Sequence, residues 1–529
     1  MNRILSWWDK NILFILTVAL MVFIPLYPKI PLFSFIEEYI VRARLEDVLV
    51  GIAFIVWLVQ LGRKKIKLDF PLTKIIGAYL AVGFLSIVTN VLFTGWIPMQ
   101  GIHIGKALLH LARYTEYFFL GFLVFSACQN KKQLKIIVGV LFGVLLTLTI
   151  YGWGQRYFYW PVFSTMNREF SKGMVLYLTP HARVNATFAG HYDLAAYLVL
   201  VLPITLAVAL KQKLWWQKAL LLTIHFGGLW LMIVAASRIS FFAMLPGIAL
   251  VLWLIIAEAE TWKKRLGRGL KWGGLYLVVL GFLLLGWGDD VTTRLVRSLR
   301  PIDAVYQPVF RAHEDFKIWR NSIDIAELLD IKPPENGMGV DLAALELESV
   351  MLLSDTQPVA TRPSDVFVDI PDLVATEGGM VERPRTWSAC ALKYDLSTCI
   401  RLDALWPWAI EGLERNPLFG SSYGALNKRY AEDWTEADGT DNNYLRTLGE
   451  TGILGFVFFY GALAMASVVA IRWWKQSKEG LEKWWTLGFM AAMVGILLNA
   501  IFIDVFAASK VAFMVWAFVG LMYSIKKRL

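Results

Sequence analysis

Long apolar runs alternate with short polar stretches along most of the chain. A membrane-spanning helix needs about 20 mainly apolar residues, and runs of this kind predict twelve helices. They cover residues 11–28, 46–62, 74–95, 108–127, 133–154, 192–210, 218–236, 239–257, 270–287, 446–471, 485–503 and 506–524. The pattern predicts an all-α polytopic membrane protein, whose first run stays as an uncleaved helix because no small-residue cleavage site follows it.

The predicted helices fall into two groups separated by one long polar segment. Residues 1–288 hold the first nine helices and residues 444–529 the last three. Between them, residues 289–443 are expected to form a loop domain of mixed structure. Within this domain, about residues 324–385 are acidic and rich in proline, which indicates an insertion.

Basic residues predict how the helices are oriented. They cluster after every even-numbered helix, at residues 63–67, 131–135, 211–218, 263–271, 472–483 and 526–528. Cytoplasmic loops are enriched in Lys and Arg. We therefore expect a multi-pass protein of the cytoplasmic membrane, with both termini in the cytoplasm and the 289–443 loop outside.

The net charge of +10 is explained by this topology, so it indicates no nucleic-acid partner. The basic residues are dispersed over many short loops instead of forming one binding face. Some of them are in a position to hold anionic membrane lipid.

Two of the three cysteines, Cys390 and Cys399, lie in the external loop. An oxidising compartment would allow them to form a disulfide. Sequence spacing does not fix the geometry that a disulfide needs, so two unpaired side chains fit the sequence equally well.

An ionisable face is predicted in the helix over 108–127. His110, Arg113 and Glu116 recur every third residue, which places them on one side of a helix. Ionisable groups inside a bilayer are costly and often mark a function. Either Arg113 and Glu116 pair with each other, or the face lines an outward-open cavity in which Arg113 contacts substrate.

Three more arginines, Arg183, Arg238 and Arg401, lie on the external side of the predicted topology. A guanidinium stays charged and matches the oxygens of a phosphate. Taken together they predict an anionic head group, the simplest being a lipid pyrophosphate. Taken singly, each could be an interfacial arginine whose charge reaches the water.

The polar stretch DNNYLRTLGETGILG, residues 441–455, opens the tenth predicted helix. Asp441 or Asn442 could cap this helix, since both residue types are favoured at the N-cap. Glu450 would then face a polar gap among the helices. A second interpretation makes the Asp-Asn tip part of a binding site.

Four stretches, in order, resemble the O-antigen ligase and O-antigen polymerase family of membrane glycosyltransferases, over about residues 183–455. They are RVNATF (183–188) leading into LAAYL, Ser237-Arg238, Arg401 followed by WAI and NPLFG (416–420), and DNNYL (441–445) through Gly455. Ala186 stands where the family usually has Gly. Asp441 stands where the ligases have the His thought to serve as the base, which favours the polymerase-type members.

The resemblance implies transfer of an oligosaccharide from an undecaprenyl-pyrophosphate donor to a hydroxyl of a glycan or lipid acceptor, on the outer face of the membrane. Asp441 would be the catalytic base. Pyrophosphate and glycan would be bound by Arg113, Arg183, Arg238, Arg401, Asn442 and Glu450.

No cofactor or metal is expected, because the chain has no HExxH, paired CxxC, Walker loop or GxGxxG motif. Two other functions stay open. One is a transporter or flippase of lipid-linked saccharide, and the other is a scaffold for cell-envelope enzymes.

Overall fold

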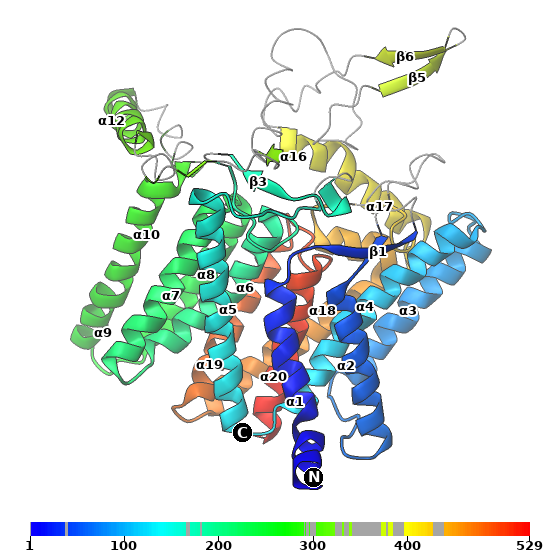
Figure 1. Cartoon of the computed structure of the whole chain (residues 1–529), viewed down its shortest axis with the longest axis horizontal. Coiled ribbons are helices and arrows are strands. Elements are labelled where there is room, and N and C mark those ends of the chain that lie inside the picture. The colour runs from blue at the N-terminus through cyan, green and yellow to red at the C-terminus, as the bar shows by residue number, and fades with distance from the viewer. Residues whose placement is uncertain are drawn as a thin grey trace.

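The computed structural model is a bundle of long helices with shorter helices, strands and loops at one end (Figure 1). It describes residues 2–36, 41–165, 170–179, 182–289, 291–292, 296, 303–322, 329, 331–332, 338–340, 372–376, 379–383, 396–426 and 439–528.

The long helices are α1 (Asn2–Leu26), α2 (Leu45–Gly62), α3 (Thr73–Leu92), α4 (Gly101–Ala127), α5 (Lys131–Tyr157), α6 (His191–Leu210), α7 (Trp215–Val234), α8 (Arg238–Ala257), α18 (Asn443–Gln476), α19 (Leu481–Asn499) and α20 (Ser509–Arg528). One further crossing runs through α9 (Trp262–Arg268), a π-helical segment (Gly269–Gly273) and α10 (Gly274–Trp287). All twelve predicted runs therefore fall on helices.

Eleven helical segments in the described part of the chain are long and apolar enough to cross a membrane. The prediction of a helical polytopic membrane protein is confirmed at this level. The expected crossing over 108–127 lies in α4, which is long enough but is not among the eleven. This helix carries the ionisable face with Arg113 and Glu116, which lowers its hydropathy.

Two helices form the centre of the bundle. About 94% of the α6 span and 89% of the α20 span are buried inside the protein. Helix α6 packs against α7, α8 and α19, and α20 packs against α4. Lipid is as apolar as these side chains, so close packing rather than the hydrophobic effect holds such helices together.

The elements outside the bundle are short, apart from the 19-residue helix α12. The helices among them are α12 (Asp303–Asn321), α16 (Leu396–Ile400) and α17 (Trp406–Arg415), with a π-helical segment Arg401–Leu405 between the last two. Strands β1 (Pro31–Ile36) and β2 (Val41–Arg44) pair antiparallel, β3 (Leu176–Leu178) and β4 (Met338–Val340) pair parallel, and β5 (Asp372–Thr376) and β6 (Gly379–Arg383) pair antiparallel.

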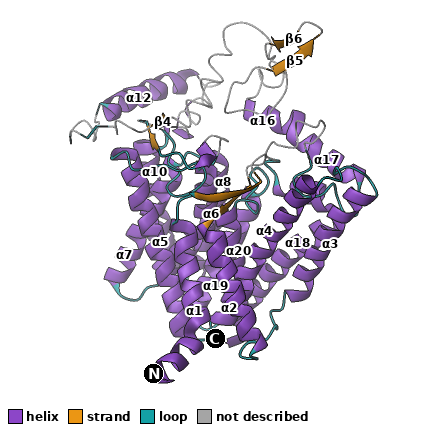
Figure 2. Cartoon of the chain, turned by 45° about the vertical axis from the view of Figure 1, so that its right-hand side comes forward, coloured by secondary structure: helices purple, strands orange, loops and turns teal. Residues whose placement is uncertain are grey.

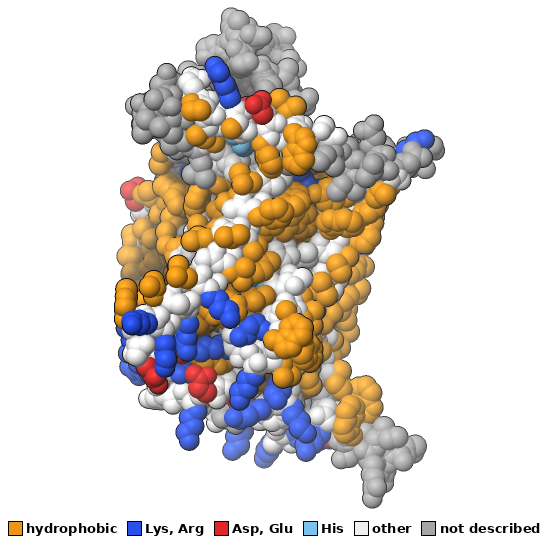
Figure 3. Space-filling view, turned by 90° about the vertical axis from the view of Figure 1, so that its left-hand side faces the viewer, with side chains coloured by type: hydrophobic (Ala, Val, Ile, Leu, Met, Phe, Trp, Pro, Cys, Tyr) orange, Lys and Arg blue, Asp and Glu red, His pale blue; other side chains and the backbone are white. Residues whose placement is uncertain are grey.

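Both chain termini lie at the end of the bundle opposite these strands (Figure 2). On the face that carries α9 and α10, Lys and Arg side chains gather toward the end of the termini, and a band of hydrophobic side chains lies above them (Figure 3). This distribution fits the expected orientation, and the assignment of this end to the cytoplasm stays a prediction. Most of the expected acidic insertion, 324–385, lies outside the described residues.

Candidate functional site

The start of α18 is fixed by two neighbouring asparagines. The side-chain oxygen of Asn442 accepts hydrogen bonds from the backbone N–H groups of Tyr444 and Leu445, each at 3.0 Å. Asn443 donates its backbone N–H to the carbonyl of Ala500 at 2.8 Å, and its side-chain oxygen accepts from the N–H of Phe506 at 2.8 Å. Capping by Asn442 is therefore confirmed, and Asn443 ties the helix start to the loop over 500–508.

Asp504, in that loop, holds the turn before α18. One of its oxygens accepts from the backbone N–H groups of Thr440 (2.9 Å) and Asp441 (3.3 Å), and the other accepts from that of Asn442 (3.2 Å). Asp441 has φ of 50°, a left-handed conformation that Asp tolerates better than most residues. The carboxylate of Asp504 thus selects the backbone shape that presents Asp441. The sequence analysis did not identify this residue.

Asp441 and Arg401 form an ion pair, with 2.9 Å between Nη2 and Oδ2. The Arg401 side chain is 11% exposed and that of Asp441 is 45% exposed, so the pair is reached from one side. Partial burial raises the pKa of Asp441 to about 6; Arg401 opposes this rise and the nearby Asp504 adds to it. A carboxylate in this state can exchange a proton near neutral pH.

A second charged network runs along the first turns of α18. Arg446 donates to Asp504 at 3.0 Å and to Glu450 at 3.2 Å. Glu450 is buried and also accepts from the backbone N–H of Gly424 at 3.4 Å. Protein groups thus fill the polar gap expected around Glu450, so this residue has a structural role. Its expected contact with substrate stays a prediction.

Helix α18 is interrupted at Gly452, which has φ of 66° and ψ of −169°. The turn formed by NPLFG packs into the interruption: the N–H of Ile453 donates to the carbonyl of Pro417 at 2.9 Å, and the N–H of Ser421 donates to the carbonyl of Gly449 at 2.7 Å. A Cβ on Gly452 would lie 2.4 Å from the carbonyl carbon of Leu418. The turn and the helix opening therefore form one structural unit.

Helix α3 completes this unit with two polar side chains. Ser86 donates to the carbonyl of Glu450 at 2.9 Å, and Asn90 donates to the carbonyl of Gly420 at 2.7 Å. Both side chains are buried. Backbone groups freed by a broken helix must be satisfied inside a membrane; Ser86 supplies a partner for one of them, and Asn90 holds the turn that packs against the break.

The segment RVNATF leads into α6 through a buried loop. The Arg183 guanidinium lies 3.2 Å from Nε2 of His191. Ala186 has φ of 48°, so the residue that replaces the family's Gly is in a left-handed conformation. Val184 donates its N–H to the carbonyl of Val234 at 3.1 Å, which joins this loop to the end of α7.

Arg238 begins α8, four residues after the end of α7. In the same turn, Ser237 donates to Ser240 at 3.0 Å, and Ser240 donates to the side-chain oxygen of Asn499 at 3.2 Å. Asn499 is the residue before Ala500, to which the start of α18 is bonded. The four motif stretches are therefore connected through one network of contacts, although no described contact joins the guanidinium groups of Arg183, Arg238 and Arg401 to one another.

Several buried polar atoms in these segments have no hydrogen-bond partner among the described residues. They are Oδ1 of Asn185, Nδ1 of His191, Oγ of Ser422 and Nδ2 of Asn499. Buried polar groups are nearly always hydrogen-bonded. Similar atoms occur elsewhere in the described chain, so these four do not by themselves identify a ligand site.

Arg113 is engaged by two carboxylates outside these segments. It forms a two-point ion pair with Asp47 of α2, one contact being 3.1 Å, and a contact of 3.1 Å with Glu116. The ion-pair interpretation of this helical face is therefore observed, with Asp47 as an unforeseen third member. A contact of Arg113 with substrate stays a prediction.

Cys399 is bonded in a disulfide, and Cys128 is free and buried. Cys390, the partner expected for Cys399, lies outside the described residues. Within the described ranges, no three His, Cys, Asp or Glu side chains converge on a point that could hold a metal ion.

The sequence matches no protein-family model and no curated protein.

Proposed function

We propose that this chain is a membrane glycosyltransferase that moves an oligosaccharide from a lipid-pyrophosphate donor to an acceptor hydroxyl, as O-antigen polymerases and ligases do. The observation that carries the proposal is the ion pair of Asp441 and Arg401, 2.9 Å apart, with the carboxylate half exposed. It combines an acid–base group with a cation suited to phosphate in one accessible place.

In the proposed reaction step, Asp441 and Arg401 have separate roles. Asp441 takes the proton of the acceptor hydroxyl, whose oxygen forms a bond to the anomeric carbon of the donor sugar. The bond from that carbon to the pyrophosphate breaks, and its electron pair leaves on the phosphate oxygen. Arg401 stabilises the charge that grows there, a contribution that is large when the cation is already in place.

Binding of the donor would also change the pKa of Asp441, the proposed base. In the free protein Arg401 lowers the pKa of Asp441 against the effect of burial. A pyrophosphate that takes over the guanidinium removes this influence and adds negative charge nearby. The pKa of Asp441 then rises, so the carboxylate becomes a stronger base when the donor is bound.

The choice between polymerase and ligase rests on the resemblance to the O-antigen ligase and polymerase family. Asp441, in place of the ligases' His, favours a polymerase whose acceptor is a glycan, with a lipid acceptor as the ligase alternative. We place this chemistry on the outer face of the cytoplasmic membrane and propose that it needs neither metal nor cofactor. Arg183 and Arg238 are proposed to bind the rest of the donor, since their segments join the Asp441 turn through the contacts at Val234, Asn499 and Ala500.

One observation favours a different function. The interruption of α18 at Gly452 resembles the broken helices that bind substrates in transporters, so a flippase of lipid-linked saccharide is the second candidate. In this chain the carbonyls of Gly449 and Glu450 are bonded to Ser421 and Ser422. Carbonyls engaged in this way are less available to an ion or substrate, which favours the transferase.

A transfer assay tests the proposal. Purified protein in nanodiscs receives a lipid-pyrophosphate-linked oligosaccharide and EDTA, and product length is followed by mass spectrometry. Wild type is compared with Asp441→Asn, Arg401→Gln and Glu414→Gln, the last being an exposed carboxylate on α17 that serves as a matched control.

We expect longer lipid-linked chains from wild type and the control, and at least 100-fold less product from the other two variants, on the scale of a lost charge-stabilising group. Equal transfer by Asp441→Asn and Glu414→Gln would exclude Asp441 as the base. Lipid movement across the bilayer without transfer would favour the flippase, and full function of Arg401→Gln would favour a scaffold.

A further inference from the structure

The crossing formed by α9 and α10 is poorly packed against the rest of the bundle. Only 11% of the span Trp262–Trp287 is buried, against 94% of the α6 span. Large apolar side chains along it are exposed, with Trp262 of α9 at 74% and Leu270 of the π-helical segment at 70%. Another molecule must therefore cover most of this helix in the membrane.

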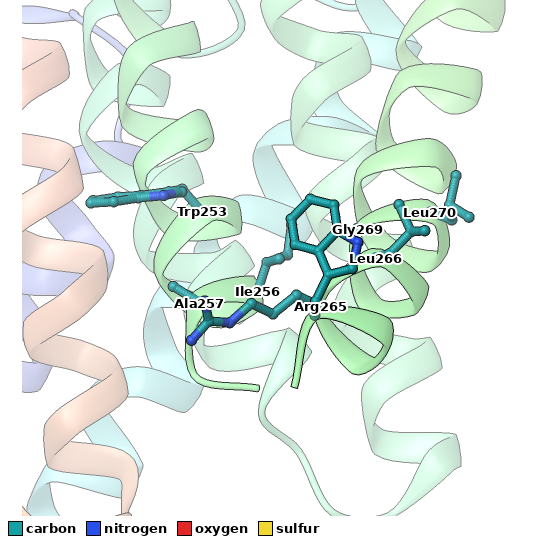
Figure 4. A pocket seen from close by; sticks show the side chains of 8 residues that line it. Trp253, Ile256, Ala257, Arg265, Leu266, Gly269 and Leu270 are labelled. Carbon is teal, nitrogen blue, oxygen red and sulfur yellow. The ribbon is translucent and has the colours of Figure 1, made fainter. Parts of the chain in front are cut away.

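A cavity of about 440 Å³ lies between α8 and this crossing. The indole rings of Trp253 and Trp262, together with Ile256, Leu266 and Leu270, make its walls largely apolar (Figure 4). Gly269, in the π-helical segment, leaves part of the cavity unfilled, since a Cβ there would meet only Ile256, at 3.8 Å.

Arg265 places a cation at this apolar cavity (Figure 4). Its Nε donates to the carbonyl of Ala259 at 2.8 Å, which fixes the side chain in the turn between α8 and α9. The two nearest acidic residues in the sequence are engaged elsewhere: Glu258 pairs with Lys211 at 2.5 Å, and Glu260 pairs with Lys264 at 3.1 Å. Within the described chain, Arg265 forms no ion pair.

The surroundings of Arg265 are strongly basic. Residues 258–271 contain five Lys or Arg against two Glu, and Lys218 of α7 lies nearby, with its Nζ 5.1 Å from the ring of Trp272. Figure 3 shows basic side chains gathered at this end of the molecule, below the hydrophobic band. Exposed Trp at such a boundary is typical of the region where lipid head groups lie.

We propose that this cavity binds an anionic phospholipid of the leaflet on the side of the termini. One acyl chain fills the space between Trp253, Leu266 and Gly269, and the phosphate contacts the Arg265 guanidinium. Charge complementarity selects an anionic over a zwitterionic lipid, and the apolar walls select a lipid over free phosphate. The bound lipid supplies the packing between α8 and α9 that protein side chains do not, and this site is independent of the proposed transfer reaction.

Native mass spectrometry of the detergent-purified protein tests the proposal. Phosphatidylglycerol and phosphatidylcholine with the same acyl chains are titrated separately, and the fraction of protein with one bound lipid is measured. Arg265→Gln removes the cation. Gly269→Leu fills the cavity at unchanged charge, and Gly269 has φ of −61°, which any residue adopts. Lys475→Gln, an exposed basic residue at the end of α18, is the matched control.

We expect wild type and Lys475→Gln to bind phosphatidylglycerol more tightly than phosphatidylcholine. Arg265→Gln should bind it roughly fivefold more weakly, the effect of about one basic residue at a membrane surface, and Gly269→Leu should weaken it as much or more. Unchanged melting temperature and size-exclusion profile show that the variants are folded.

Three results would overturn the proposal. Equal binding of the two lipids to wild type would remove the selectivity for charge. Full binding by Gly269→Leu would mean that the head group is held at the surface without the cavity. Displacement of the lipid by inorganic phosphate alone would identify a phosphate site instead.

Discussion

Replacing Asp504 with Asn tests whether this residue positions Asp441. The oxygen Oδ2 of Asp504 accepts from two backbone N–H groups and from Arg446, and Oδ1 accepts from the N–H of Asn442. In the variant, the amide oxygen can replace Oδ2 as the acceptor of these three hydrogen bonds. The amide nitrogen is a donor, so it faces the N–H of Asn442 without forming a bond.

The size of the effect follows from these four bonds. Hydrogen bonds to charged groups contribute about 1.5–3 kcal/mol, against about 0.5–1.5 kcal/mol for neutral ones. One bond is lost, the two other backbone bonds become neutral, and the bond from Arg446 keeps its charged donor but loses its charged acceptor. Because bonds in one network do not add independently, we expect the turn over 440–442 to open more easily by about 2–4 kcal/mol. Amide protection there should fall by roughly 30-fold to several hundredfold.

Hydrogen exchange of the protein in nanodiscs, read on peptides that cover 439–445, measures this change directly. The transfer assay should show a loss of about 100-fold, because a displacement of about 1 Å at a reacting group has an effect of that size. Glu479→Gln makes the same chemical change in the turn between α18 and α19 and serves as the control. If exchange and transfer in Asp504→Asn equal those of the control, Asp504 does not position the turn.

Three further predictions follow from the same geometry. Ala186→Gly should stabilise the protein by about 0.5–1 kcal/mol, since it relieves the strain of φ at 48° at some entropic cost; a lower melting temperature than wild type would contradict this. Gly452→Ala should lower both melting temperature and expression, because φ is 66° and the added Cβ would lie 2.4 Å from the carbonyl carbon and oxygen of Leu418, whereas Gly461→Ala in the regular part of α18 should be mild. Transfer should need ionised Asp441, whose pKa is about 6, so kcat/KM measured between pH 4.5 and 8 should rise with pH through that value and fall about tenfold per pH unit below it; a flat profile would exclude Asp441 as the titrating base.

The helices could be predicted because a bilayer permits few alternatives. Spanning segments must satisfy their own backbone and present apolar side chains, so composition alone located all twelve. Their ends were less accurate. The runs predicted over 485–503 and 506–524 are α19 and α20, which end at Asn499 and begin at Ser509. The loop between them is apolar and largely buried, so hydropathy did not separate it from helix.

The same loop explains why Asp504 was missed. It is the only acidic residue between Glu482 and the end of the chain, and a lone carboxylate among apolar residues is itself a signal. Nothing in the sequence connects it to residues 440–442, about 60 positions earlier. The ion pair of Asp441 with Arg401 is similarly distant in sequence. Motif resemblance identified both members, and only the fold brings them to 2.9 Å.

The interruption of α18 escaped prediction for a different reason. The apolar run over 446–471 predicts one helix, and Gly452 and Gly455 within it are also compatible with close helix packing. The positive φ of Gly452 arises because the NPLFG turn inserts its own backbone into the helix. Such a contact depends on two segments together, and neither segment reveals it alone.

The charged side chains around the start of α18 form a network of ion pairs and hydrogen bonds. This network explains why, of its carboxylates, Asp441 is the one that a substrate could reach. Arg446 is shared by Asp504 and Glu450, and Asp504 is further saturated by three backbone N–H groups. Glu450 is buried and bonded on both sides. Among the described residues, the guanidinium of Arg401 is the ionic partner of Asp441, and Asp441 is 45% exposed. Under the proposed function, a phosphate that competes for Arg401 would release Asp441 and leave the network that positions it intact.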